Sequence, residues 1–170
     1  SYTGKCTASQ KSSLVTALGN ALVYSDGAKN YLTNTTPSGT PRYSTWFGTY
    51  SSANWNTVKS HYTNISSVYN TQPIVFDCSC KKTNTYAYVY PSQPYKIYLC
   101  GAFWNAPATG TDSKAGTLVH ETSHFTVVAG TQDYAYGQSA AKSLAISNPS
   151  QAIMNADSHE YFAENTPAQQ

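Results

Sequence analysis

Charged residues are scarce in this sequence. Asp, Glu, Lys and Arg make up 11% of the 170 residues, and the formal net charge is +2 at pH 7. The basic residues are scattered, and only Lys81 and Lys82 are adjacent. Proteins that bind nucleic acid carry a dense basic face or stripe, so we expect no nucleic-acid partner. The abundance of Ser, Thr, Asn and Tyr suits the neutral, polar surface of a secreted protein.

Long apolar runs are missing too. No segment is hydrophobic for long enough to cross a bilayer, so we expect no membrane association. The chain begins at Ser1 with neither an initiator Met nor a charged leader, which is typical of a mature form after removal of a signal and a propeptide. Because 40% of the residues are hydrophobic and 14% aromatic, we expect one folded domain rather than disorder, with a monomer as the default.

Cysteine is limited to four residues, Cys6, Cys78, Cys80 and Cys100. A zinc site built from them is disfavoured, because a single residue separates Cys78 from Cys80 where such sites usually have two to four. We therefore expect two disulfides and an oxidising, extracellular location. Cys78 and Cys80 are too close to bridge each other comfortably, so one should bond to Cys6 and the other to Cys100.

The few charges are unevenly distributed. Residues 1–120 hold nine Lys or Arg against three acids, giving +6, whereas residues 121–170 hold one Lys against five acids, giving −4. A cleft formed by the second part would be acidic and would attract cationic substrates.

Two amphipathic helices are expected in the N-terminal part. Apolar residues recur at helical spacing from about residue 9 to 24, and residues 29–32 either continue that helix or begin another. A polar loop over 34–43 precedes a second helix at 55–69. His61 lies in this helix without a second metal ligand nearby in sequence, so we interpret it as a surface or partly packed histidine.

The hydrophobic period changes to two after residue 73. Strands are expected at 74–78, 86–90 and 96–100, and the short, turn-rich connections favour an antiparallel meander. The predicted fold class is therefore α+β, with helices and a small antiparallel sheet. Beyond the sheet, the pattern predicts a loop over 101–112 and a helix over 139–146.

The most specific motif is H-E-x-x-H, at His120, Glu121 and His124. Positions four apart on a helix lie one above the other, so both imidazoles can hold one Zn²⁺ ion. Glu121 then lies beside that ion, where a carboxylate can take a proton from water. We expect Gly130 to end the helix.

A catalytic zinc site needs a third ligand and an open fourth position. Gly130 and Thr131 form a turn signal, so the chain can reverse and send a side chain back to the metal. Asp133 is the first acid after that turn, and we predict it as the third ligand.

Two segments together resemble a known family. H-E-x-x-H at 120–124 and G-T-x-x-D-x-x-Y-G at 130–137 are similar to the aspzincin, or deuterolysin-type, metalloendopeptidases. The segments GTLVHETSHF, YLCGAFWNAP and MNADSHEYFAEN resemble the fungal peptidyl-Lys members of that family. The resemblance implies one zincin-like catalytic domain, with its cleft between a mixed lobe at about 1–110 and a helical, zinc-binding lobe at 111–170.

The resemblance also implies roles for single residues. It implies one catalytic Zn²⁺ held by His120, His124 and Asp133, with Glu121 as the base. Tyr136 becomes a hydroxyl donor near the metal, which would stabilise the oxyanion of the transition state. Tyr134 alternates with Tyr136 along the chain, so we interpret it as a packing residue.

The family further implies the disulfide pairs Cys6–Cys78 and Cys80–Cys100. An edge strand over the cleft, at 95–100 or its neighbour, would pair with extended substrate, although a sheet that serves only the core is an equal alternative.

The last helical segments, at 151–154 and 155–165, carry four titratable residues of interest. Asp157 and Glu160 are three apart and share one helical face. Taken alone they would be solvated surface acids, but the resemblance implies that they hold the ammonium group of a substrate lysine. We interpret His159 and Glu164 as surface residues without a special role.

These features predict a secreted zinc metalloendopeptidase that hydrolyses polypeptides on the amino side of lysine. In one alternative the protein is a broad-specificity aspzincin, and Asp157 and Glu160 are ordinary surface charges. In another it is a secreted zinc-containing binding module without turnover. Two sequons, at Asn34 and Asn64, are possible glycosylation sites.

Overall fold

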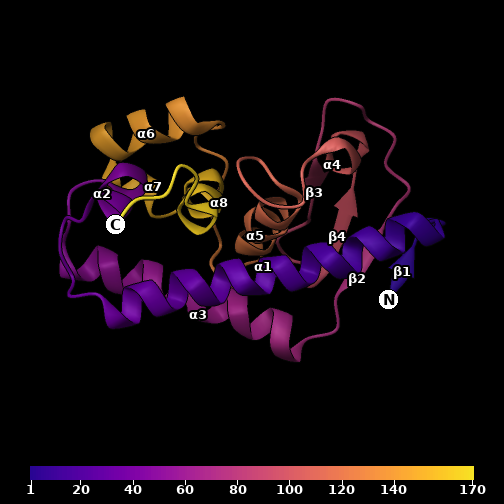
Figure 1. Cartoon of the computed structure of the whole chain (residues 1–170), viewed down its shortest axis with the longest axis horizontal. Coiled ribbons are helices and arrows are strands. Elements are labelled where there is room, and N and C mark those ends of the chain that lie inside the picture. The colour runs from indigo at the N-terminus through magenta and orange to yellow at the C-terminus, as the bar shows by residue number, and fades with distance from the viewer.

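Two long helices lie antiparallel along one face of the molecule (Figure 1). The computed structural model describes residues 1–170. α1 (Ala8–Asn34) joins both predicted N-terminal segments into one helix, and α3 (Ser52–Thr71) returns beside it. The buried residues of α1 recur at spacings of three and four, and they are Leu14, Ala17, Ala21, Ser25, Ala28 and Leu32. Because most of them are small, neighbouring helices can pack closely against this stripe.

The sheet has four short strands: β1 (Tyr2–Thr3), β2 (Val75–Asp77), β3 (Ala87–Tyr88) and β4 (Lys96–Leu99). Their order is β1-β2-β4-β3, with β1 and β4 parallel to β2 and only β3 antiparallel to β4. The predicted antiparallel meander is therefore wrong. Strands β2 and β4 bury apolar side chains and take the centre, whereas the half-buried β3 lies at an edge.

Both disulfides form at the end of this sheet. Cys6 is bonded to Cys78, and Cys80 is bonded to Cys100. These are the pairs implied by the family resemblance, and no cysteine remains free. The bonds fix the N-terminal segment and the long excursion between β2 and β4 to the central strands.

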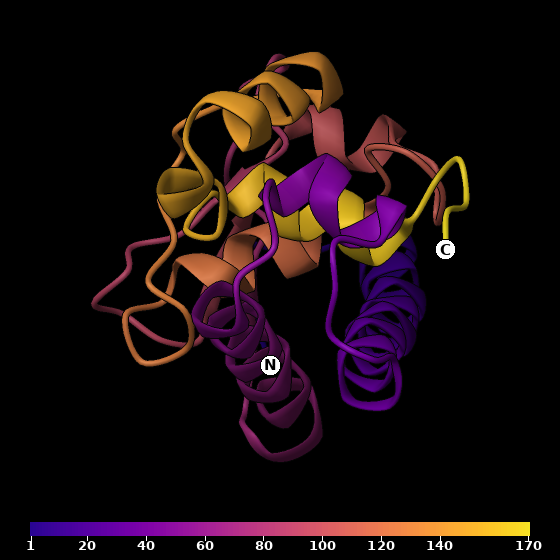
Figure 2. The ribbon, with the colours of Figure 1, turned by 90° about the vertical axis from the view of Figure 1, so that its left-hand side faces the viewer.

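Six shorter helices complete the fold: α2 (Pro41–Phe47), α4 (Gly101–Asn105), α5 (Lys114–His124), α6 (Gln138–Ser147), α7 (Pro149–Ala152) and α8 (Ala156–Glu164). Helix α5 lies between α1, α8 and the sheet. Helix α2 comes from the N-terminal part but packs against α6, α7 and α8 (Figure 2). The region predicted as a loop after β4 contains α4.

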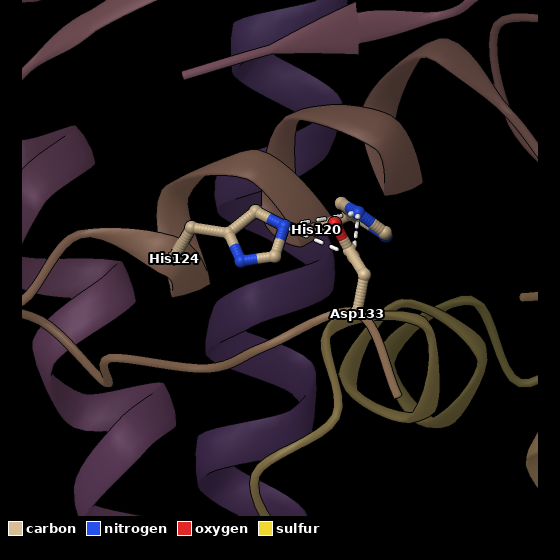
Figure 3. Close-up of side chains that lie close together, drawn as sticks. All are labelled: His120, His124 and Asp133. Carbon is tan, nitrogen blue, oxygen red and sulfur yellow. Dashed lines mark hydrogen bonds and ion pairs between the residues drawn. The ribbon is translucent and has the colours of Figure 1, made fainter. Parts of the chain in front are cut away.

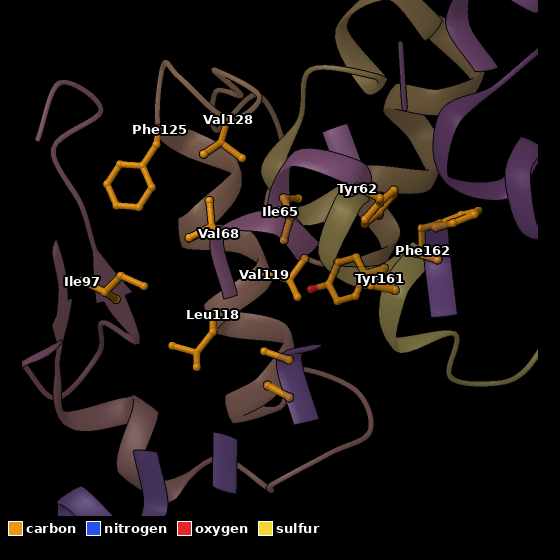
Figure 4. Close-up of a cluster of buried hydrophobic side chains, with 14 of the residues drawn as sticks. Tyr62, Ile65, Val68, Ile97, Leu118, Val119, Phe125, Val128, Tyr161 and Phe162 are labelled. Atoms are coloured by element: carbon orange, nitrogen blue, oxygen red, sulfur yellow. The ribbon is translucent and has the colours of Figure 1, made fainter. Parts of the chain in front are cut away.

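One apolar core connects the helices to the sheet. It contains 29 buried residues, including Tyr62 and Ile65 of α3, Ile97 of β4, Leu118 of α5 and Phe162 of α8 (Figure 4). A continuous core of this kind confirms a single α+β domain. None of the helices is long and apolar enough to span a membrane.

Two histidines are buried against each other: His159, which we predicted at the surface, and His61, which we predicted at the surface or partly packed. His159 is 0% exposed and His61 is 8% exposed, and Nδ1 of His61 lies 2.9 Å from Nε2 of His159. The Nδ1 atom of His159 is 2.8 Å from the carbonyl oxygen of Asn155, so it donates there, and its Nε2 accepts from His61. The surface prediction for His159 was wrong because its partner, His61, lies 98 positions away in the sequence, whereas His61 agrees with the packed alternative.

Candidate metal centre and substrate cleft

Helix α5 carries the H-E-x-x-H motif through the middle of the molecule. The Ser113 hydroxyl accepts a hydrogen bond from Gly116 N at 2.9 Å and caps the helix. Every residue from Ala115 to His124 is buried. Leu118 belongs to the apolar core, whereas the motif side chains line a cleft. The helix ends at His124 rather than at Gly130, because a turn over 125–130 follows it.

The three predicted ligands converge on one point (Figure 3). Asp133 Oδ1 lies 3.1 Å from Nε2 of His120 and 3.1 Å from Nε2 of His124. The two Nε2 atoms are 3.3 Å apart. Ligands bound to tetrahedral zinc at about 2.0–2.1 Å lie about 3.3 Å from one another, so these donor atoms have the spacing of three corners of a zinc site.

In each imidazole a hydrogen bond at Nδ1 determines that Nε2 faces the point of convergence. His124 Nδ1 is 2.8 Å from the carbonyl oxygen of Thr131, which only accepts hydrogen bonds, so Nδ1 carries the hydrogen. His120 Nδ1 is 2.6 Å from Asp157 Oδ1 and donates in the same way. With a hydrogen on each Nδ1, the Nε2 atoms of both rings face the Asp133 carboxylate. Only a shared cation or proton holds three such electron-rich atoms together, so the residues fit a divalent metal ion.

The charges around the site favour a cation. Burial alone would lower the pKa of His120, but the surrounding carboxylates, first Glu121 and then Asp133 and Asp157, raise that pKa well above its ordinary value. Burial also opposes ionisation of Asp133, yet its contacts with His120 and His124 hold the pKa of this carboxyl far below its usual range.

Glu121 lies close to the point where His120, His124 and Asp133 converge, but its carboxylate is not one of the converging groups. Its side chain is buried, and Oε2 lies 3.8 Å from Nε2 of His120. Burial raises the pKa of Glu121, against the opposing effect of the two histidines. A desolvated carboxylate of this kind is a stronger base than one in water.

The two tyrosines after Asp133 are both exposed, Tyr134 by 48% and Tyr136 by 66%. The packing role predicted for Tyr134 is therefore wrong. The Tyr136 ring lies parallel to the His120 ring at a centroid distance of 6.4 Å, on the cleft side. Partial burial raises the pKa of Tyr136, and the neighbouring Asp133 adds to the increase. Its phenol therefore stays protonated and able to donate a hydrogen bond.

A cleft of about 690 Å³ runs past these residues. One wall is the edge strand β3 with its flanking residues 84–91, and the other wall comes from α5, the 131–137 segment and α8. The edge strand at the cleft is β3, the neighbour of the 95–100 strand, whereas β4 lies inside the sheet.

Asp157 and Glu160 lie in this cleft as buried residues. The Asp157 carboxylate accepts from His120 Nδ1 and, through Oδ2, from Gly137 N at 2.7 Å. Glu160 Oε1 is 3.6 Å from His120 Nδ1, while its buried Oε2 has no hydrogen-bond partner. Asp157 thus orients the His120 ring, a role that no local signal in the sequence indicates because the two residues are 37 positions apart.

Glu164 is buried too, so our interpretation of it as a surface residue is wrong. Its carboxyl accepts from Asp112 N at 3.1 Å, and from Ser113 N and the Ser113 hydroxyl at 2.9 Å each. Burial raises the pKa of Glu160 and of Glu164, and the charge of Glu160 adds to the increase at Glu164. Glu164 therefore connects the end of α8 to the beginning of the motif helix.

Comparison with known proteins agrees with this geometry. Residues 31–164 match the aspzincin family, which is described as lysine-specific metallo-endopeptidase. The chain is 58% identical over 169 residues to a peptidyl-Lys metalloendopeptidase of Armillaria mellea, in an alignment covering 99% of this chain and 47% of the relative. It is 50% identical over 169 residues to an extracellular protease of Aeromonas hydrophila, covering 99% of this chain and 48% of that protein.

The chain thus spans about half the length of these relatives. Among solved structures, a zinc peptidase from Grifola frondosa matches with a TM-score of 0.93 and 54% sequence identity. That match covers 97% of this chain and 100% of the other.

Proposed function

The chain belongs to the aspzincin family of lysine-specific metallo-endopeptidases, and we propose that it is a zinc endopeptidase that cleaves polypeptides on the amino side of lysine. The observation that carries this proposal is the convergence of two imidazole nitrogens and one carboxylate oxygen at 3.1–3.3 Å, with a second buried carboxylate beside them. A structural zinc site would use four protein ligands, whereas three ligands leave one position open for chemistry.

His120, His124 and Asp133 are the residues that would hold the ion. Zinc bound there supplies a Lewis acid that lowers the pKa of water and polarises the peptide carbonyl. Asp157 and the Thr131 carbonyl oxygen keep the two rings in the correct tautomer, so that Nε2 of each is free to bind.

Glu121 is the base in this proposal. It accepts a proton from the attacking water as the new carbon–oxygen bond forms, and it returns that proton to the amine nitrogen as the carbon–nitrogen bond breaks. The raised pKa of the buried Glu121 suits both halves of this task, because the carboxylate is basic enough to take the proton and acidic enough to release it.

Tyr136 stabilises the oxyanion in this proposal. Its protonated hydroxyl donates a hydrogen bond to the carbonyl oxygen, and the bond strengthens as negative charge develops there. The exposure of Tyr136 is consistent with a contact that is completed only when substrate occupies the cleft.

The substrate backbone pairs with the free edge of β3 in this proposal. An edge strand offers unpaired N–H and C=O groups, and an extended peptide along β3 would lie in the cleft opposite the motif helix.

The acids of α8 provide the lysine preference. The carboxyl groups of Asp157 and Glu160 both line the cleft, and burial raises the pKa of Glu160, so an ammonium group beside it would stabilise its charged form. An ammonium group is a compact donor and fits between Glu160 and Asp157 better than the broad, planar guanidinium of arginine. Asp157 contributes its charge, although both of its oxygens already accept hydrogen bonds.

We also propose that the protein is secreted. Two disulfides require an oxidising compartment, and one relative is named as an extracellular protease. Of the two sequons, Asn34 is exposed and suits glycosylation, whereas the amide of Asn64 donates to Val128 O at 2.8 Å and is not free.

The Glu121→Gln variant tests the catalytic part of the proposal. We expect it to bind zinc like the parent and to hydrolyse a lysine-containing peptide about 10²–10⁴-fold more slowly, because the general base is lost. The parent with a chelator, and then with zinc restored, serves as the control for metal dependence. If Glu121→Gln binds zinc and hydrolyses the peptide as fast as the parent, Glu121 is not the base; if neither zinc-loaded protein hydrolyses it, the protein is a non-catalytic binding module.

A further inference from the structure

Asp133 is held in a segment that has almost no apolar packing. Gln132, Asp133, Tyr134 and Tyr136 are all exposed, and no helix or strand contains them. A metal ligand on such a segment must be positioned by polar contacts, because a loop without anchors samples many conformations.

Three of these contacts come from one side chain, that of Asn155, which is 0% exposed. Its Oδ1 accepts from Tyr134 N at 2.9 Å and from Ala135 N at 3.1 Å. Its Nδ2 donates to Ala135 O at 3.2 Å and to the Ser158 hydroxyl at 3.0 Å. The amide orientation is unambiguous, since the two backbone N–H groups need an acceptor and the Ala135 carbonyl needs a donor.

The backbone around Asn155 fixes the other side of Asp133. Gln132 forms a parallel bridge with Asn155, in which Gln132 N donates to Met154 O at 2.8 Å and Ala156 N donates to Gln132 O at 3.0 Å. The residue before Asp133 and the two residues after it are therefore all hydrogen-bonded to the segment 154–156 that leads into α8.

We propose that Asn155 is a positioning residue that holds Asp133 ready for the metal. This inference rests on the proposed metal site and adds a residue that does not touch it. Without the side-chain amide, Tyr134 N and Ala135 N donate to water instead, and the segment loses its fixed conformation. Asp133 must then be ordered when the metal ion binds. That ordering cost lowers metal affinity, as loss of an orienting partner generally does, by about 10–100-fold.

Zinc affinity measured by competition with a chromogenic chelator tests this inference directly. We expect Asn155→Ala to bind zinc about 10–100-fold more weakly than the parent, and its cobalt-substituted form to have a weakened or shifted d–d absorption band. Asn155→Asp keeps the acceptor for the two N–H groups and should retain more of the affinity. The matched control is Asn148→Ala, since Asn148 also accepts from a backbone N–H, at 3.2 Å from Gln151, but caps α7 away from the metal. It should bind zinc like the parent.

The double variant with Asp133→Ala separates positioning from general damage. If Asn155 acts through Asp133, Asn155→Ala should cost less than about twofold in affinity once Asp133 has been removed, because there is no ligand left to position. Unchanged zinc binding by Asn155→Ala, or its full penalty in the Asp133→Ala background, would overturn the inference alone. Unchanged zinc binding by Asp133→Ala itself would overturn the metal site and the proposed function with it.

Discussion

Gly116 of the motif helix packs directly against α8, and replacing it gives a sharp test of this packing. A Cβ atom at this position would overlap Glu164 Oε2 and would lie 2.6 Å from Glu164 Cδ and 2.9 Å from Glu160 Cγ. We predict that Gly116→Ala destabilises the protein, although alanine is the better helix former by about 1 kcal/mol.

The magnitude follows from the contacts that Glu164 must give up. To make room, its carboxyl has to leave Asp112 N, Ser113 N and the Ser113 hydroxyl, three hydrogen bonds worth about 1 kcal/mol each. The loss of about 3 kcal/mol exceeds the gain in helix propensity, so the free energy of unfolding should fall by about 2 kcal/mol. For a chain of this length that change lowers Tm by about 4–8 °C.

The assay is urea and thermal unfolding of the zinc-loaded protein. Gly27→Ala is the matched control, because Gly27 lies within α1 and a Cβ there would meet nothing within 4 Å. It should leave stability unchanged or raise it by up to about 1 kcal/mol. Truncating Glu164 as well should remove most of the penalty of Gly116→Ala. The reasoning is refuted if Gly116→Ala is as stable as Gly27→Ala.

Three further predictions concern acid stability and catalysis. Because burial lowers the pKa of His61 to about 4, from 6.5, the unfolded chain binds a proton between these pH values that the folded chain does not, so stability falls as pH falls through this window. The His61→Asn variant keeps a hydrogen-bond donor to His159 but does not titrate. Between pH 6.5 and pH 4 the free energy of unfolding of the parent should fall by up to about 3 kcal/mol more than that of the variant. An equal fall in both proteins would contradict the lowered pKa of His61. Glu160→Gln should lower kcat/KM for lysine substrates by about 10–100-fold with little effect on zinc binding, and an unchanged cleavage pattern would count against the pocket. Tyr136→Phe should lower kcat by about 10²–10³-fold at constant zinc affinity, and an unaltered kcat would remove Tyr136 from the mechanism.

The three proposed metal ligands could be identified from the sequence because their signals are local. His120 and His124 are one helical turn apart, and Asp133 follows the first turn signal after them, so spacing alone brought these residues together. Helices α1 and α3 were predicted for the same reason, since their period of three and four is set by neighbours along the chain.

The parts that could not be predicted depend on residues far apart in sequence. The spacing of turns identified three strands but not their order, and β2 pairs with β4 rather than with the intervening β3 because β4 has the more buried side chains. In the same way, Asp157 reads as a surface acid until α8 is packed against α5, where it accepts from His120. From the sequence alone, polar residues on a short helix are interpreted as solvent-exposed, because their hydrogen-bond partners lie far away along the chain.

The central claim, a zinc endopeptidase that cleaves before lysine, is tested most directly by one digest. An unfolded protein of known sequence is incubated with the enzyme, with and without a chelator, and every new N-terminus is mapped by mass spectrometry. The account predicts that nearly all new termini are lysine and that none forms when zinc is removed. Chelator-sensitive cleavage before many residue types would contradict the lysine pocket of Glu160 and Asp157, and absence of cleavage by the zinc-loaded protein would contradict the enzymatic function itself.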